Sequence, residues 1–149
     1  GKAGCFESHQ RVMQLALAAG LSNVLVLEDD ARFFPERLTP DFLDSVRRAL
    51  SRTTWELVYF GHCSLNFEIC NPIKLIAPHS PDNVLASSKG SWMAHAYLVS
   101  APMMKKIAAE VYANQHYDAF LFQRSNPATR FVVYPMLYFQ DDRPGTASQ

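Results

Sequence analysis

The sequence predicts an α/β domain in which helices flank a mixed, mostly parallel sheet. Helical and strand periods alternate along the chain, and the aliphatic run at residues 24–27 leads directly into Glu28, Asp29 and Asp30. A fully apolar run of this length is typical of a central strand that is covered on both faces. Ligands of open α/β sheets bind at the carboxyl ends of such strands, so the three acids stand where a site is expected.

Two helices flank this strand in the chain. The first is expected to have Ser8 as its N-cap and Gly20 just past its end, with an apolar stripe at Val12, Leu15, Ala16 and Ala19. Residues 31–35 are expected to form a loop. The second helix begins at Thr39 and Pro40 and is expected to bury Phe42, Leu43, Val46, Ala49 and Leu50.

The second half of the chain continues the alternation. Strands are predicted over residues 55–60, 94–100 and 131–134, and a short helix over 117–122. Ser100 is expected to cap a further helix with the stripe Met104, Ile107, Ala108 and Val111. Residues 61–92 form a long irregular stretch in which only 73–77 resemble a strand, and such stretches are usually functional or mobile. Residues 141–149 are expected to be a frayed tail.

Length and charge limit the functional classes. A chain of 149 residues fits a single domain, residues 1–149, that buries roughly 70% of its unfolded surface. Fourteen basic residues balance fourteen acidic ones, so no overall field favours nucleic acid or an anionic membrane as a partner. No apolar run approaches the ~18 residues of a membrane span, and the first residues lack a secretory signal pattern, so the compartment stays undetermined.

The three cysteines lack a paired Cys-x-x-Cys spacing. His62, Cys63, Cys70 and His79 could suggest zinc, but their spacing matches no common site. A disulfide between Cys63 and Cys70 would require an oxidising compartment.

The acidic triplet has two interpretations. Adjacent carboxylates repel one another, so a cation or a donor-rich partner would stabilise Glu28, Asp29 and Asp30 at one strand end. A hard divalent ion such as Mg²⁺ or Mn²⁺ takes oxygen ligands of this kind. The alternative is a solvated acidic turn with no ligand.

Two sequence motifs follow one another in the first 30 residues. Residues 4–9 read Gly-Cys-Phe-Glu-Ser-His before a helix, and that helix leads into the aliphatic strand with Glu-Asp-Asp. This order resembles glycosyltransferase family 25, the group that contains lipooligosaccharide and procollagen galactosyltransferases. Residues 96–100, 117–121 and 135–140 resemble later segments of the same family, so the likeness spans roughly residues 4–140.

The resemblance implies a GT-A type fold and a metal-assisted, inverting transfer of a hexose. The expected donor is a UDP-sugar, often UDP-galactose, the acceptor is a glycan or a glycoprotein or glycolipid, and the cofactor is Mn²⁺ or Mg²⁺. Asp30 resembles the direct metal ligand, and Glu28 would orient the donor or reach the ion through water. Asp29 belongs to the same donor-binding group, although it is the acid expected to point elsewhere.

Asp118 is the expected general base. An inverting transfer needs a group that removes the proton of the acceptor hydroxyl, and Asp118 lies in a segment that matches the family. The alternative is a carboxylate near a helix N-terminus that the helix dipole favours, worth about 0.3–1 kcal/mol.

Several other candidate contacts also have a purely structural interpretation as the alternative. Ser8 and His9 are placed at a helix start, where an anion such as a diphosphate could bind, or they form a plain cap and a hydrogen-bonded histidine. His95, Tyr97 and Gln140 are candidate donor or acceptor contacts, with a structural role as the alternative for His95. Two further residues, Trp92 and Met93, could form an apolar platform for a sugar or belong to the core.

One departure from the family pattern bears on activity. Family members carry a strand and a helix before the Gly-Cys-x-x-Ser-His motif, whereas only three residues precede Gly4 here. These 149 residues are therefore expected to lack this first strand-helix unit, either as a fragment of a longer chain or as a reduced relative whose uridine pocket is incomplete. Two other hypotheses stand beside the enzyme: a non-catalytic relative that binds glycans or a partner, and an unrelated Mg²⁺-dependent phosphotransferase or phosphohydrolase.

Overall fold

The computed structural model describes residues 1–61, 74–75, 84–88 and 94–141. Its helices are α1 (Lys2–Ala18), α2 (Pro40–Arg52), α3 (Ala101–Ala109) and α4 (Tyr117–Arg124), with a 3-10 turn at Pro35–Arg37. Its strands are β1 (Asn23–Leu27), β2 (Ala31–Phe33), β3 (Leu57–Tyr59), β4 (Lys74–Leu75), β5 (Leu85–Ser87), β6 (Ala96–Ser100), β7 (Arg130–Val133) and β8 (Tyr138–Gln140).

The main sheet is mixed, as predicted, but it is mostly antiparallel rather than mostly parallel. Six strands follow the order β1-β6-β3-β7-β5-β4. Only β3 and β7 run parallel, while the other four neighbouring pairs are antiparallel. The alternation of helices and strands indicated an α/β protein correctly, but it could not reveal that β6 enters the sheet between β1 and β3.

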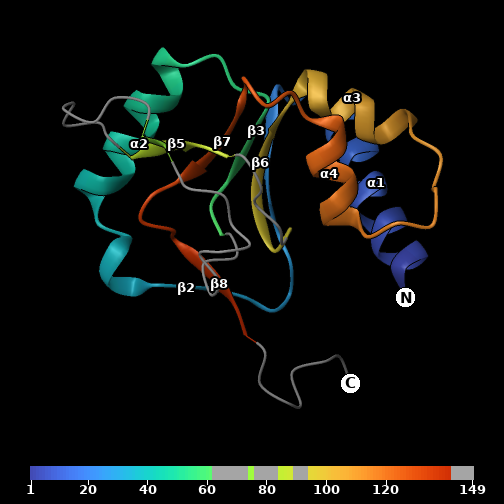
Figure 1. Cartoon of the computed structure of the whole chain (residues 1–149), viewed down its shortest axis with the longest axis horizontal. Coiled ribbons are helices and arrows are strands. Elements are labelled where there is room, and N and C mark those ends of the chain that lie inside the picture. The colour runs from blue at the N-terminus through green and yellow to red at the C-terminus, as the bar shows by residue number, and fades with distance from the viewer. Residues whose placement is uncertain (62–73, 76–83, 89–93, 142–149) are drawn as a thin grey trace.

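Helices cover both faces of this sheet. Figure 1 shows α1, α3 and α4 gathered on one face and α2 on the other. Two hydrophobic cores lie on opposite faces of the sheet. The residues of the central strands contribute to them alternately, because successive side chains of a strand point to opposite faces. Leu57 and Tyr59 pack toward α1, α3 and α4, whereas Val58 packs with Val46 and Ala49 of α2.

The aliphatic strand β1 lies at an edge of the sheet, which corrects the prediction of a central strand covered on both faces. Its pairing partner is β6, with Leu25 opposite Leu98. Val26 is buried, but Leu25 and Leu27 keep 43% and 47% of their surface exposed. An unbroken apolar run cannot distinguish a strand buried on both faces from an edge strand with an exposed apolar face.

A small second sheet holds the segment after the acids. Residues 31–35 were predicted as a loop, yet β2 pairs with β8 so that Ala31 lies opposite Gln140. The expected frayed tail is wrong at its first residue, because Asp141 is buried and its Oδ2 lies 3.6 Å from Nε of Arg32. Residues 142–149 lie outside the described residues. Strands of three residues carry too few alternating positions for a period to be recognised.

The first helix starts seven residues earlier than predicted, so Ser8 is not its N-cap. Gly1 holds that position, and the hydroxyl of Ser8 donates instead to the carbonyl of Gly4 within the helix. The predicted end is confirmed. Gly20 has a φ of +72°, and the N–H groups of Gly20 and Leu21 donate to the carbonyls of Leu17 and Ala16.

The later helices were predicted well. Thr39 caps α2 by accepting from the N–H of Phe42, and Val46 and Ala49 are buried. Leu43, expected to face inward, is 42% exposed. Ser100 precedes α3 as predicted, without a side-chain capping bond.

The predictions for the remaining elements are confirmed in part and wrong in part. Val111 lies beyond the end of α3 and is 81% exposed rather than part of its stripe. The strand β5 was missed, while β4 falls inside the short stretch predicted at residues 73–77. The predictions for His62, Cys63, Cys70, His79, Trp92 and Met93 lie outside the described residues. Within the part of the chain that is described, no helix combines the length and apolar character that crossing a membrane requires.

Candidate functional site

The three acids occupy a tight turn between β1 and β2. The N–H of Glu28 donates to the carbonyl of His95, and the N–H of Ala31 donates back to the carbonyl of Glu28. These bonds hold the turn at the end of β1, beside β6. Asp29 is exposed, and its carbonyl accepts from the guanidinium of Arg32 at 2.9 Å.

Asp30 and Gln140 meet at this turn. Because β2 pairs with β8, the amide nitrogen of Gln140 lies 2.7 Å from Oδ2 of Asp30. The N–H of Asp141 also donates to the carbonyl of Asp30. The other carboxylate oxygen, Oδ1, is buried and has no hydrogen-bond partner among the described residues. A buried carboxylate oxygen without a donor is costly, so this atom is suited to a cation.

Glu28 belongs to a second set of contacts, directed toward α1. Its Oε1 lies 3.0 Å from Nε2 of His9, and Nδ1 of His9 lies 2.7 Å from the hydroxyl of Tyr97. The hydroxyl of Tyr97 lies 3.0 Å from that of Tyr117. Carboxylate, imidazole and two phenols therefore form a continuous hydrogen-bonded chain from the turn into the core.

The direction of these hydrogen bonds follows from the end groups. A carboxylate only accepts, so in the neutral tautomer of the imidazole that pairs with it, His9 donates to Glu28 through Nε2–H and accepts at Nδ1 from Tyr97. Tyr97 then accepts from Tyr117. Burial raises the pKa of Tyr97 and of Tyr117 well above the ordinary tyrosine value, with Glu28 contributing in the same direction, so both phenols stay protonated.

Packing fixes the imidazole of this chain. His9 lies in the interior of α1, not at its N-terminus as expected, and shares the buried face of the helix with Phe6 and Met13. Its ring stacks on Tyr117 with 4.0 Å between centroids and 9° between planes. The expected placement of residues 8–9 at a helix start is therefore wrong, because these residues lie within the helix, while their contact with a donor stays a prediction.

Asp118 lies in the first turn of α4, as predicted, and is partly buried. Its Oδ1 accepts from the N–H of Ala119 at 2.8 Å. The carboxylate lies close enough to Cys5 and Tyr59 to raise the pKa of both, after the larger effect of burial. Asp118 therefore faces the N-terminal part of α1 and the same side of the sheet as His9.

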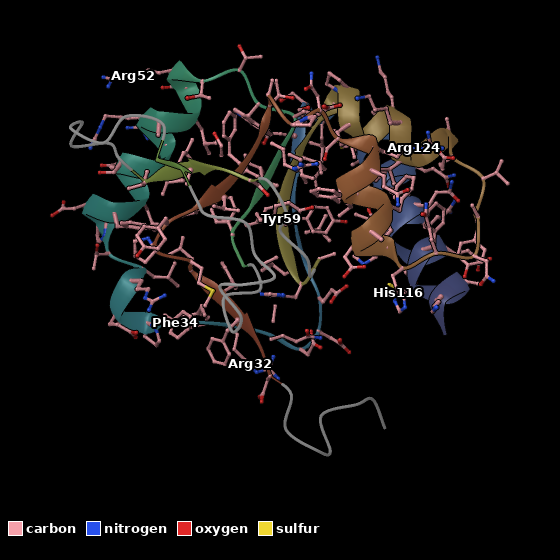
Figure 2. The ribbon with its side chains drawn as sticks, in the orientation of Figure 1. Arg32, Phe34, Arg52, Tyr59, His116 and Arg124 are labelled. Atoms are coloured by element: carbon pink, nitrogen blue, oxygen red, sulfur yellow. The ribbon has the colours of Figure 1, made fainter. Side chains whose placement is uncertain are left out.

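Tyr59 joins this region from β3 and lies near the centre of the molecule, while His116, the N-cap residue of α4, marks where that helix begins (Figure 2). The hydroxyl of Tyr59 is buried without a hydrogen-bond partner among the described residues. Burial raises its pKa, so the phenol stays neutral.

His95 plays a structural part at the turn. It is buried, its carbonyl accepts from Glu28, and a Cβ built on Gly61 would come within 2.0 Å of its Nε2. Gly61 is thus required by the close approach of the imidazole.

Sequence reasoning missed Cys5 and Tyr117 as members of the site. Both stand inside segments that the sequence had singled out, Cys5 at residues 4–9 and Tyr117 directly before Asp118. Tyr117 was visible only as a helix residue, since its role depends on the stacking against His9. Cys5 was considered only for disulfide or zinc spacing along the chain, and its neighbour Glu28 is distant in sequence.

The similar proteins reported below all carry the name of one protein family. The chain is 31% identical over 112 residues to a rat protein named "Probable inactive glycosyltransferase 25 family member 3", covering 73% of this chain and 18% of the relative. The chain is a distant homologue of glycosyltransferase 25 family members. A human "Inactive glycosyltransferase 25 family member 3" is 28% identical over 92% of this chain and 25% of its own length.

A further relative in this family carries no such qualification in its name. The Aedes aegypti "Glycosyltransferase 25 family member" is 43% identical over 63 residues, covering 41% of this chain and 10% of its own length. No protein-family model matches the chain. The chain thus spans less than a fifth of the rat and mouse relatives, at 18% and 17% of their length.

Proposed function

We propose that this family 25 homologue forms a donor-binding and catalytic part of a metal-assisted glycosyltransferase with a GT-A type fold. It would transfer a hexose, with galactose as the expected sugar, from a UDP-sugar to a glycan, glycoprotein or glycolipid acceptor with inversion. The observation that carries this proposal is the carboxylate of Asp30, which is held by Gln140 on one oxygen and has a buried, partnerless second oxygen.

The residues at the turn fit a divalent cation. Oδ1 of Asp30 lacks a donor among the described residues, and a carboxylate oxygen is the ligand that Mn²⁺ and Mg²⁺ prefer. When bound, such an ion would stabilise the negative charge that develops on the leaving diphosphate. Asp30 would hold the ion, Gln140 would hold Asp30, and Asp29 and Ser8 would remain outer donor contacts.

The acceptor side of the proposal rests on Asp118. Its carboxylate is partly exposed and is oriented by the N–H of Ala119, so one oxygen is fixed by the helix start. In this position it would accept the proton of the acceptor hydroxyl as the hydroxyl attacks the anomeric carbon. The hydrogen-bonded chain of Glu28, His9 and Tyr97 would hold these side chains in place for contact with the donor.

A non-catalytic glycan- or partner-binding relative is the second candidate. The observation that favours it is that rat, mouse and human relatives are named inactive or probable inactive. The two candidates share the surface around the acidic turn and differ in whether sugar is transferred.

The substitution Asp30→Ala tests the metal site. In calorimetric titrations with Mn²⁺ present, we expect UDP binding to weaken by at least about tenfold, equivalent to about 1.4 kcal/mol, because the ion loses its direct carboxylate ligand. Asp44→Ala is the matched control, since Asp44 is exposed on α2 and forms its ion pair with Arg47 of the same helix. Equal UDP affinity in the two variants would contradict the proposed metal site.

Asp118→Asn separates the two candidate functions. If the chain is catalytic, this variant binds UDP with Mn²⁺ as the unmodified chain does but loses transfer or donor hydrolysis. If the unmodified chain binds UDP and neither transfers nor hydrolyses UDP-galactose, the non-catalytic relative is the better description.

A further inference from the structure

Three potential metal ligands of mixed chemistry gather where α1 meets the turn after β1. They are the sulfur of Cys5, a ring nitrogen of His9 and a carboxylate oxygen of Glu28, and these atoms all lie within 4.8 Å of one another. Cys5 and His9 stand four residues apart on α1, so one helical turn brings them to the same face. Glu28 approaches from the turn, with Oε1 3.0 Å from Nε2 of His9.

We propose that Cys5, His9 and Glu28 bind a zinc-class divalent cation and leave its fourth position open. Thiolate, imidazole and carboxylate are the ligands that Zn²⁺ uses in proteins, and three protein ligands with one open position form a recurrent zinc arrangement. A thiolate is poorly suited to Mg²⁺ or Mn²⁺, which prefer oxygen. This set therefore differs in metal preference from the oxygen ligand offered by Asp30.

The imidazole is already oriented for this role. Nδ1 of His9 is hydrogen-bonded to Tyr97 and the ring is stacked on Tyr117, which leaves Nε2 directed at Glu28. Metal-binding histidines generally have such a partner on the second ring nitrogen. With a cation on Nε2, the ring proton would reside on Nδ1 and be donated to the oxygen of Tyr97, whose own proton would turn toward Tyr117.

The charges around Cys5 also favour a cation. Burial raises the pKa of the Cys5 thiol, and the carboxylates of Glu28 and Asp118 raise it further, with only the N-terminal amine acting in the opposite direction. A divalent ion would offset this negative potential, and the thiol proton would be released to solvent when the sulfur binds.

A nucleophilic cysteine fits the same residues less well. An activated thiol needs a ring nitrogen that can take its proton, but both nitrogens of His9 are engaged, one by Tyr97 and one by Glu28. The raised pKa of Cys5 also disfavours the thiolate in the absence of a metal.

Cobalt titration of the reduced, metal-free and tag-free 149-residue chain tests the proposal. We expect Co²⁺ to bind with a thiolate-to-cobalt charge-transfer absorption, Zn²⁺ to displace it, and Zn²⁺ to raise the Tm. Cys5→Ser is expected to abolish the charge-transfer band and to weaken Zn²⁺ binding by at least about tenfold. Cys5 is exposed as a residue and only its sulfur is partly desolvated by its neighbours, so this variant should keep the thermal transition of the unmodified chain.

Two controls decide which residues are responsible. The double variant Cys63→Ser/Cys70→Ser removes the other cysteines and is expected to keep the band, and Glu7→Gln alters an exposed acid on the same helix and should keep it as well. A band that persists in Cys5→Ser, or that disappears in the double variant, would overturn the proposal.

The substitution Tyr97→Phe provides a second test of the zinc site if Cys5→Ser alters folding. Loss of the hydroxyl that orients His9 should lower the Zn²⁺ affinity by about 10- to 100-fold while the thiolate band remains. Unchanged affinity would count against His9 as a ligand. These measurements use no nucleotide and leave Asp30 intact, so their failure would be distinguishable from failure of the proposed glycosyltransferase function.

Discussion

At the scale of single residues, the candidate site consists of side chains that satisfy one another. Oε1 of Glu28 lies within hydrogen-bond distance of His9, and His9 in turn bonds Tyr97, so neither the carboxylate nor the imidazole is buried without a partner. Asp30 differs, because only one of its two oxygens is bonded among the described residues. An added ligand would therefore be most stabilising at the second oxygen of Asp30, Oδ1.

Glu56 shows how a buried carboxylate away from this site is stabilised. Burial by itself would raise its pKa, but a hydrogen bond and ion pair from Lys106 and a bond from the N–H of Asn126 lower the pKa below its ordinary value overall. The stabilisation of the folded state is therefore fully present above the ordinary pKa, and it is lost as the pH falls through the lower pKa of the folded state.

Glu56→Gln should make the pH dependence of stability shallower in acid. At neutral pH we expect the unmodified chain to be the more stable of the two. The difference should shrink as the pH falls through the lowered pKa of folded Glu56, below which both chains carry an uncharged side chain. Urea unfolding followed by circular dichroism across this pH range measures it. Glu36→Gln, an exposed acid, is the control, and equal slopes for Glu56→Gln and the unmodified chain would contradict the account.

At the scale of elements, α1 connects the sequence motif to the site. Its buried face carries Phe6, His9 and Met13, so the packing that holds the helix on the sheet also positions the imidazole. The C-terminal end of α1 is set by Gly20, whose left-handed conformation, together with the backbone bonds donated by Gly20 and Leu21, turns the chain toward β1.

Two glycine substitutions, one within α1 and one just past its end, should act in opposite directions. Gly20→Ala is expected to destabilise the fold by about 1–2 kcal/mol, because the positive φ strains any residue with a Cβ. Gly4→Ala is expected to stabilise it by roughly 0.5–1 kcal/mol, because Gly4 is helical and a Cβ there meets nothing within 4 Å. Thermal unfolding of both variants checks the pair, and the same sign of effect for both would refute this description of the helix end.

At the scale of the whole molecule, the exposed edge of the sheet is the feature that the sequence least anticipated. Among the described strands β1 pairs only with β6, and none of them lies against its other side. Leu25 and Leu27 add exposed apolar side chains on one face of the same strand. Long apolar edge strands of this kind promote association between chains.

Leu25→Lys is therefore expected to reduce concentration-dependent self-association of the chain. The folding free energy should change by only about 0.5 kcal/mol, because Leu25 is already 43% exposed. Sedimentation velocity over a range of protein concentrations measures the effect. Val111→Lys introduces the same charge at a residue that is 81% exposed and outside any strand, so it should leave self-association unchanged. An equal reduction by both variants would point to net charge rather than the β1 edge.

The sequence by itself determined the parts of this protein that depend on local chemistry. Capping by Thr39, the helix end at Gly20, the strands β3 and β7 and the placement of Asp118 at a helix start follow from propensities within a few residues. The same local patterns identified the acidic turn and its family resemblance.

Only the tertiary structure decided which of these residues meet. The position of β6 beside β1 places Tyr97 next to His9, and the pairing of β2 with β8 brings Gln140 to Asp30. The same packing sets Cys5 beside Glu28 and leaves β1 at an edge. These contacts join segments that are distant along the chain, and a periodic pattern in one segment carries no information on its partner in space.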